Sequence, residues 1–166
     1  MPMAVGAVYI KRRRVRRGQR QEPVTEPRHP GLDYQEFKRR LEEGADLSGA
    51  DLTGARLDRM DLHNRRLSGL NLSRASLRRA ALSGTDLSGS RLDHADFSGA
   101  DMRGANLTEV SLLETIFWKA DLSGADLSGS RQLVMAGLRR ARFDATTRWP
   151  PGFDPSAAGA EPKRRH

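Results

Sequence analysis

Residues that could carry chemistry are few and widely separated in this sequence. The four histidines are His29, His63, His94 and His166. Cysteine is absent, which excludes thiol catalysis, disulfides and cysteine-ligated metals. No nucleophile–base pair, phosphate-binding loop or metal-ligand spacing is present, and the many aspartates recur at fixed intervals, as turn residues do. The sequence therefore predicts a protein that is not an enzyme and that needs no cofactor or metal.

The other chemically distinctive residues are basic, and they gather at the ends of the chain. The net charge of +8 comes from residues 1–44 and 130–166, because residues 45–129 carry ten basic and twelve acidic groups. We expect residues 1–31 to form a basic disordered tail. Its densest run is a candidate polyanion-binding arm: Lys11, Arg12, Arg13, Arg14, Arg16 and Arg17. The alternatives are a solvated tail without a function, or a start codon assigned upstream of the true one.

Between these ends the chain repeats every five residues, from Ala45 to Gly129. The unit reads Ala-Asp-Leu-Ser-Gly, and its central position is Leu, Phe or Met in all seventeen copies. A period of five fits neither a helix nor a strand. It predicts a chain that turns a corner once per unit, with the central residue buried and the polar positions on an outer wall. The expected fold is an all-β solenoid.

This stretch resembles the pentapeptide repeat family, whose pattern is A(D/N)LXX. The resemblance implies a right-handed quadrilateral β-helix with about twenty residues per coil, and therefore about four coils. The flanks are consistent with caps. Residues 32–44 predict a short N-terminal capping helix, with Asp33 as N-cap and Gly44 at its end. We expect residues 130–155 to form an irregular C-terminal cap in which Phe143, Trp149 and Phe153 cover the last coil. We expect residues 156–166 to form a frayed basic tail.

Three successive units depart from the pattern. Met60, Arg65 and Leu70 occupy an inward position that is small in most other units. An arginine pointing into the column would be costly. We expect Arg65 to turn outward at a local distortion, and pairing with an aspartate at the coil edge is the alternative.

In a coil of four units, residues twenty apart stack on one wall. The wall through Leu57, Leu77, Phe97 and Phe117 is called the basic wall, and it displays five basic side chains against Asp58 and Asp96: Arg56, Arg59, Arg78, Arg79 and Lys119. The opposite wall is called the acidic wall, and it displays four acidic side chains against Arg66: Asp46, Asp86, Glu109 and Asp126. The column is thus expected to be polarised across its width, which steers partners.

The basic wall leads into an apolar cluster formed by Leu113, Ile116 and Trp118. These residues stand at positions that are polar in nearly every other unit. We expect the returning segment 133–138 to fold over them. If it does not, the cluster and Lys119 form the best partner or dimer surface on the molecule.

The favoured function is a non-enzymatic protein-interaction scaffold with an unknown protein partner. The resemblance implies one alternative, a DNA mimic that modulates DNA gyrase or topoisomerase, although a near-neutral column argues against it. A second alternative is a weak electrostatic contact with nucleic acid through the basic arm and the basic wall. No apolar run approaches the roughly 18–20 residues of a membrane span, and the apolar start precedes its basic block, unlike a signal peptide. The expected location is the cytoplasm. The sequence does not determine the oligomeric state, and a homodimer is among the alternatives.

Overall fold

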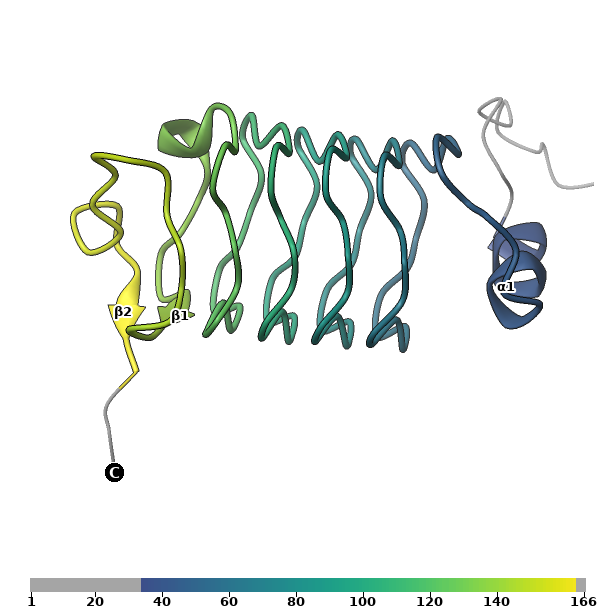
Figure 1. Cartoon of the computed structure of the whole chain (residues 1–166), viewed down its shortest axis with the longest axis horizontal. Helices are drawn as coiled ribbons and strands as arrows, with labels where there is room; N and C mark the ends of the chain where they lie inside the picture. Colours follow the sequence, from purple (N-terminus) through teal and green to yellow (C-terminus); the bar gives the residue numbers. More distant parts are fainter. Residues whose placement is uncertain (1–33, 164–166) are drawn as a thin grey trace, which may run out of the picture.

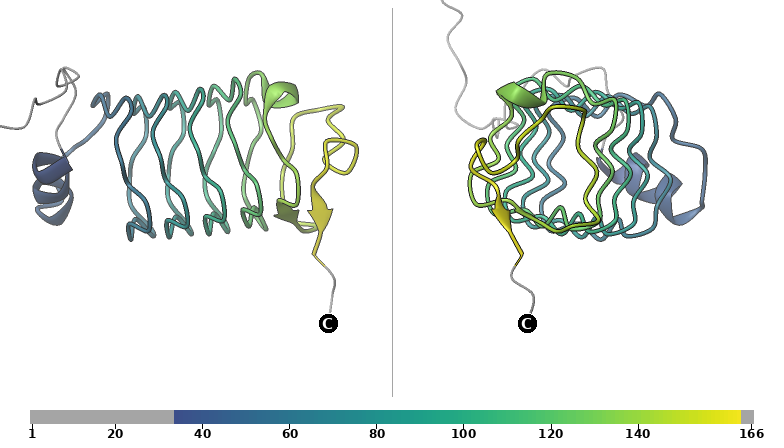
Figure 2. Two further views of the ribbon diagram at one scale, coloured as in Figure 1. Left: turned by 180° about the vertical axis from the view of Figure 1, so that it is seen from behind. Right: turned by 60° about the vertical axis from the view of Figure 1, so that its left-hand side comes forward.

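The computed structural model describes residues 34–163, which form a column of stacked coils (Figures 1 and 2). Helix α1 (Tyr34–Glu42) lies at one end, and the two short strands β1 (Arg142–Phe143) and β2 (Glu161–Pro162) lie at the other. The coils between them are joined by isolated parallel bridges between residues twenty apart, from Asp51–Asn71 to Ser111–Arg131. Each coil therefore contains four of the five-residue units.

Each unit folds in the same way because equivalent positions have the same burial, hydrogen bonding or backbone conformation in successive units. All seventeen central residues are buried, with at most 2% of their surface exposed. The Asp or Asn before the central residue accepts a hydrogen bond from the backbone two residues further on, as in Ser48 N to Asp46 Oδ1 at 2.9 Å. The fifth residue adopts a left-handed conformation in every unit, from Gly49 (φ 72°) to Gly129 (φ 69°). Glycine recurs at the corners because it adopts the left-handed conformation without steric cost. The predicted solenoid is confirmed.

The inward position two residues before the leucine is filled by a small side chain in most coils. Where that residue carries a hydroxyl, the hydroxyl donates to a carbonyl of the preceding coil. Thr85 Oγ1 bonds Leu62 O at 2.7 Å, and Thr115 Oγ1 bonds Leu92 O at 2.8 Å. These buried donors are therefore satisfied.

The three departures from the pattern leave the backbone unchanged. Arg65 N donates to Leu62 O at 3.2 Å, and Arg65 O accepts from Asp86 N at 2.9 Å, as in regular units. The Arg65 side chain is exposed, with no ion pair inside residues 34–163. The expected outward turn of Arg65 is present, but the expected distortion is wrong, because the side chain alone can redirect the charge to water. Leu70 is buried in the core, and Met60 packs against it.

The bridges continue beyond Gly129, where the repeat pattern ends. Their spacing widens to 21 residues at Ile116–Gly137 and to 22 at Asp126–Arg148. The extra residues are absorbed by irregular turns, including the 3-10 helix η1 (Leu133–Met135). Strand β2 then pairs in parallel with β1. Residues 161–163 are thus hydrogen-bonded to the column and differ from the frayed tail expected there, because their backbone groups pair with the open end of the ladder.

The two ends of the column carry the remaining apolar residues. Phe37 and Leu41 of α1 are buried in the same cluster as the repeat leucines; the expected N-cap Asp33 lies outside the described residues. At the other end, Trp149 contacts both Phe143 and Phe153, with ring centroids 5.8 Å and 5.4 Å apart. All three rings pack against the core.

Candidate partner-docking surface on the basic wall

The basic wall is assembled by a continuous series of bridges, in which residues 56, 76, 96, 116 and 137 lie side by side. A shallow hollow of about 520 Å³ opens on it. Its lining includes five of the eight predicted surface residues together with Asp58 and Asp96: Arg59, Arg78, Arg79, Trp118 and Lys119. Arg56 and Ile116 lie in the bridged strands beside the hollow. Leu113 is half-buried at the preceding corner.

The expected cover over the apolar cluster is wrong for Ile116 and Trp118, which remain 42% and 43% exposed. Leu133 and Leu138 do not fold outward. They enter the core as inward residues of the next coil, because the bridge from Ile116 to Gly137 carries the segment directly above this wall. Val134 of η1 points into solvent with 81% exposure. The Lys119 ammonium lies 4.2 Å from the centre of the Trp118 ring, a cation–π contact.

The two carboxylates of the wall are engaged by their own neighbours. Arg78 Nε donates to Asp96 Oδ2 at 2.6 Å, and this bond raises the pKa of Arg78. Burial opposes ionisation of Asp96, but hydrogen bonds from Ser98 and Arg78 outweigh burial and lower the pKa of Asp96. Asp58 Oδ1 accepts from Ser76 Oγ at 2.5 Å and from Arg78 N at 3.0 Å. Arg78 is thus largely neutralised, and the other basic side chains set the charge of the wall.

Two arginines that the sequence pattern missed extend this wall. Arg139 O accepts from Lys119 N at 3.3 Å, which places Arg139 beside Trp118 in the next coil. Arg140 follows at the left-handed corner with φ 60°, as Lys119 does with φ 57°. The repeat register hides them, since bridges here are 21 residues apart. The triplet Leu138-Arg139-Arg140 repeats Leu77-Arg78-Arg79 and is the signal that could have found them.

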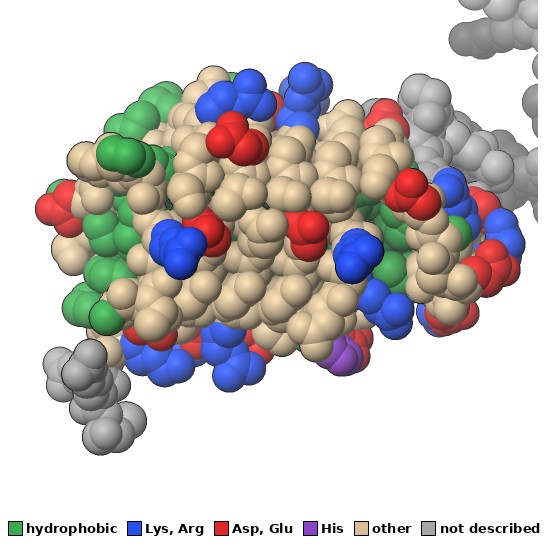
Figure 3. All heavy atoms as spheres, viewed as in Figure 1, with side chains coloured by type: hydrophobic (Ala, Val, Ile, Leu, Met, Phe, Trp, Pro, Cys, Tyr) green, Lys and Arg blue, Asp and Glu red, His purple; other side chains and the backbone are tan. Residues whose placement is uncertain are grey.

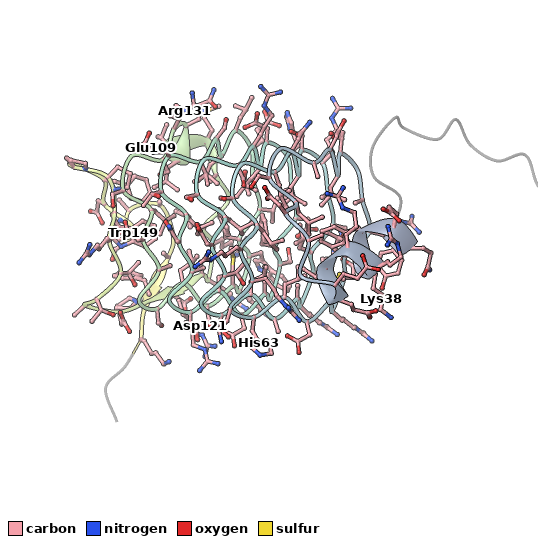
Figure 4. All side chains as sticks on the ribbon, turned by 45° about the vertical axis from the view of Figure 1, so that its right-hand side comes forward. Lys38, His63, Glu109, Asp121, Arg131 and Trp149 are labelled. Carbon is pink, nitrogen blue, oxygen red and sulfur yellow. The ribbon has the colours of Figure 1, made fainter. Side chains whose placement is uncertain are left out.

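The remaining candidates do not converge on a chemical site. His63 pairs with Asp61, whereas His94 lies 3.2 Å from Glu114 on a different wall. Figure 4 shows His63 and Asp121 on one edge of the column, and Glu109 and Arg131 on the opposite edge. Among residues 34–163 no cluster of three His, Cys, Asp or Glu side chains could hold a metal ion. The polyanion arm, His29 and His166 lie outside the described residues.

The surface of the column is mixed in charge. Figure 3 shows acidic and basic side chains interspersed over the face in view. On the acidic wall, Asp126 bridges to Arg148, whose Nη1 lies 3.5 Å from the Asp126 carboxylate. Within the described part of the chain, no helix has the length and apolar character needed to cross a membrane.

A column of five-residue units with buried leucines and left-handed corners is a β-helix solenoid of the repeat-protein class. The chain belongs to the pentapeptide repeat family. The sequence model of that family, described as pentapeptide repeats, matches eight copies over residues 43–69, 55–93 and 90–129. None of the curated proteins matches the sequence.

Several solved structures of this family are similar to the chain. HetL, a pentapeptide repeat protein involved in heterocyst differentiation regulation in the cyanobacterium Nostoc sp. strain PCC 7120, is 33% identical, with a TM-score of 0.59 over 68% of this chain and 53% of HetL. The match therefore spans about half of HetL. A second Nostoc PCC 7120 pentapeptide repeat protein is 30% identical over 81% of this chain and 99% of its own, with a TM-score of 0.40. QnrB1, a plasmid-mediated fluoroquinolone resistance protein, is 19% identical over 72% and 79%, with a TM-score of 0.34.

Proposed function

We propose that this protein is a non-enzymatic interaction scaffold and that the basic wall, with Ile116 and Trp118, docks its protein partner. One observation carries the proposal: Ile116 and Trp118 are exposed beside Arg79 and Lys119, at positions that are polar in nearly every other unit. Tryptophan and arginine are the residues most enriched where protein interfaces concentrate their binding energy.

The column suits a scaffold because side chains on its walls are exposed to solvent, whereas each of its ends is covered by a flanking segment. We infer a right-handed, four-sided β-helix, closed at one end by α1 and at the other by the aromatic segment around Trp149. Backbone groups of the walls are paired between coils, so a partner must recognise the side chains that the walls display. On the basic wall, exposed large apolar side chains and unpaired basic side chains occur together.

The nucleic-acid alternatives receive less support from the described residues. Residues 34–163 carry nineteen basic and eighteen acidic groups, a net charge of +1. A mimic of duplex DNA requires a dense negative surface, because duplex DNA carries one charge per roughly 1.7 Å of its axis. A protein that binds DNA directly presents a strongly positive interface. The mixed charge of this column is suited to neither task.

The proposal is tested by site-specific photocrosslinking in cells that express the protein natively. A photoreactive residue at position 116 is compared with one at position 66, which lies on the acidic wall. We expect a discrete adduct with one protein from position 116 and none from position 66. The purified partner should then bind Trp118→Ala about tenfold more weakly than the wild type. Adducts from neither position, or the same adducts from both, would refute the docking surface.

A further inference from the structure

We propose that the basic wall binds an extended acidic segment of a protein partner, laid along one corner of the column. This inference rests on the proposed function and adds the chemistry of the ligand. The corner in question, called the basic corner, consists of five stacked residues, each of them left-handed: Arg59, Arg79, Gly99, Lys119 and Arg140.

Within residues 34–163, the four cations of the basic corner have no ion pair and no side-chain hydrogen bond to a carboxylate. Several basic residues elsewhere do have an acidic partner. Arg78 is held by Asp96 at 2.6 Å, Arg103 by Asp101 at 2.6 Å, and Arg142 by Asp121 at 3.0 Å. The basic corner, in contrast to these three residues, is a line of unneutralised charge.

The backbone of the basic corner is costly for such side chains. Every corner position is left-handed, and a residue with a Cβ there costs roughly 1–2 kcal/mol more than glycine. The acidic wall uses glycine at four of its five corner positions: Gly49, Gly69, Gly89 and Gly129, with Glu109 as the exception. The basic corner uses glycine once. The corner formed by Gly54, Arg74, His94 and Glu114 also uses glycine once, so two of the four corners bear this cost.

The spacing of the basic corner suits an extended chain. At about 4.8 Å per coil, the cations stand near 0, 5, 14 and 19 Å along the corner. A strand rising about 3.3 Å per residue covers that length with about six residues, and every second side chain faces the wall. Gly99 adds no side chain to the line, and Arg79 Cγ lies 3.5 Å from the place that a Cβ of residue 99 would take. Trp118 lines the same hollow as Arg79 and Lys119, so a side chain of the ligand that enters the hollow can contact it.

The surroundings of the basic corner favour a polypeptide over nucleic acid. Asp58 and Asp96 line the same hollow. A peptide with carboxylates only at alternate positions can place an uncharged residue opposite them, whereas a nucleic acid carries a phosphate on every nucleotide. One face of the Trp118 ring is engaged by Lys119 at 4.2 Å, and repeated aromatic platforms are typical of single-strand binders. Ile116, 42% exposed, offers an apolar contact that a protein segment with alternating acidic and apolar residues can use.

The test is a fluorescence anisotropy titration with the full chain. The probe is a labelled eight-residue peptide with glutamate at alternate positions and one leucine. The comparison ligands are the same peptide with lysine for glutamate and an eight-residue oligothymidine. Two double variants with the same change in net charge are compared. One is Arg79→Glu with Lys119→Glu on the basic corner, and the matched control is Arg66→Glu with Arg74→Glu on other walls, where Arg74 also sits at a left-handed corner with φ 60°.

We expect the glutamate peptide to bind and the basic-corner variant to weaken it about tenfold or more, with about twofold or less for the control pair. Equal weakening by both pairs would overturn the proposal, because it would assign binding to net charge or to the basic arm. Binding of the lysine peptide as tightly as the glutamate peptide would also overturn it. So would oligothymidine binding more tightly than the glutamate peptide and depending on Arg79 and Lys119, which would assign the corner to nucleic acid.

The acidic-segment inference and the docking surface can fail separately. If a partner is crosslinked from position 116 but the glutamate peptide does not bind, only the acidic-segment inference is refuted. If no crosslink forms from position 116, the proposed docking surface is refuted.

Discussion

Replacing Phe97 by alanine should be among the most damaging single changes to this column. The Phe97 side chain has no exposed surface, and its ring stacks on that of Phe117 with centroids 5.5 Å apart and an interplanar angle of 13°. Truncating a buried phenylalanine costs about 3–5 kcal/mol in unfolding free energy, because the cavity cannot close fully. Loss of the ring pair accounts for about 0.5–1.5 kcal/mol of that.

The matched control is Phe97→Leu, since leucine fills the same inward position at Leu57 and Leu77. It keeps most of the volume and should cost about 1 kcal/mol, chiefly through the lost ring pair. Urea unfolding followed by circular dichroism measures the wild type, both Phe97 variants, Phe117→Leu and the double leucine variant. The double-mutant cycle should give a coupling of about 0.5–1.5 kcal/mol.

Two results would refute the reasoning. If Phe97→Leu costs as much as Phe97→Ala, the site selects for an aromatic ring and the cavity left by alanine is not the main cause of destabilisation. If Phe97→Ala costs less than about 1 kcal/mol, residue 97 does not lie in a closely packed bore. A split transition in Phe97→Ala would agree with the reasoning, because each coil contacts only its neighbours and a weak middle coil uncouples the two ends.

Three further predictions concern individual positions. Arg65→Ala should change the unfolding free energy by less than about 0.5 kcal/mol because the side chain is exposed, whereas Leu70→Ala should cost about 2–5 kcal/mol because it truncates a side chain buried in the core; similar urea midpoints for the two would contradict this. Thr115→Val should cost about 1 kcal/mol by deleting the 2.8 Å hydroxyl bond to the preceding coil, and thermal unfolding beside the wild type is the measurement. The hydrogen-bonded Arg103 side chain lowers the pKa of Asp101 below 3.8, so the stabilisation from this carboxylate is present above pH 3.8 and is lost as pH falls through the lowered value. The stability gap between wild type and Asp101→Asn should accordingly shrink below pH 3.8 in acid titrations monitored by circular dichroism, and a gap that widens there would reverse the sign.

Most of the fold could be predicted from the repeat because each unit is a local structure. The Asp or Asn before the leucine and the left-handed fifth residue each respond to contacts within a few residues. Repeating such a unit leaves one way to bury the leucines, which is to stack the coils. The membership of Arg59, Arg79 and Lys119 on one wall followed from their positions in a twenty-residue coil.

The candidate site was predicted less completely because the charge and the exposure of its side chains depend on neighbouring coils. Neutralisation of Arg78 requires Asp96 from the next coil. Exposure of Trp118 depends on the route of the segment that contains Leu133 and Leu138, and that segment entered the core. Arg140 joined the basic corner only because one extra residue around η1 shifted the register.

The sequence by itself determined that leucines five residues apart face inward and that residues of one wall recur every four units, because a strict period converts position along the chain into position around the column. The tertiary structure alone decided which charges on the basic wall are neutralised, which apolar side chains stay in water, and how the chain continues beyond Gly129. Those outcomes depend on contacts between successive coils and on the place where the five-residue repeat ends. The repeat pattern does not predict the path of the chain after the repeat has ended.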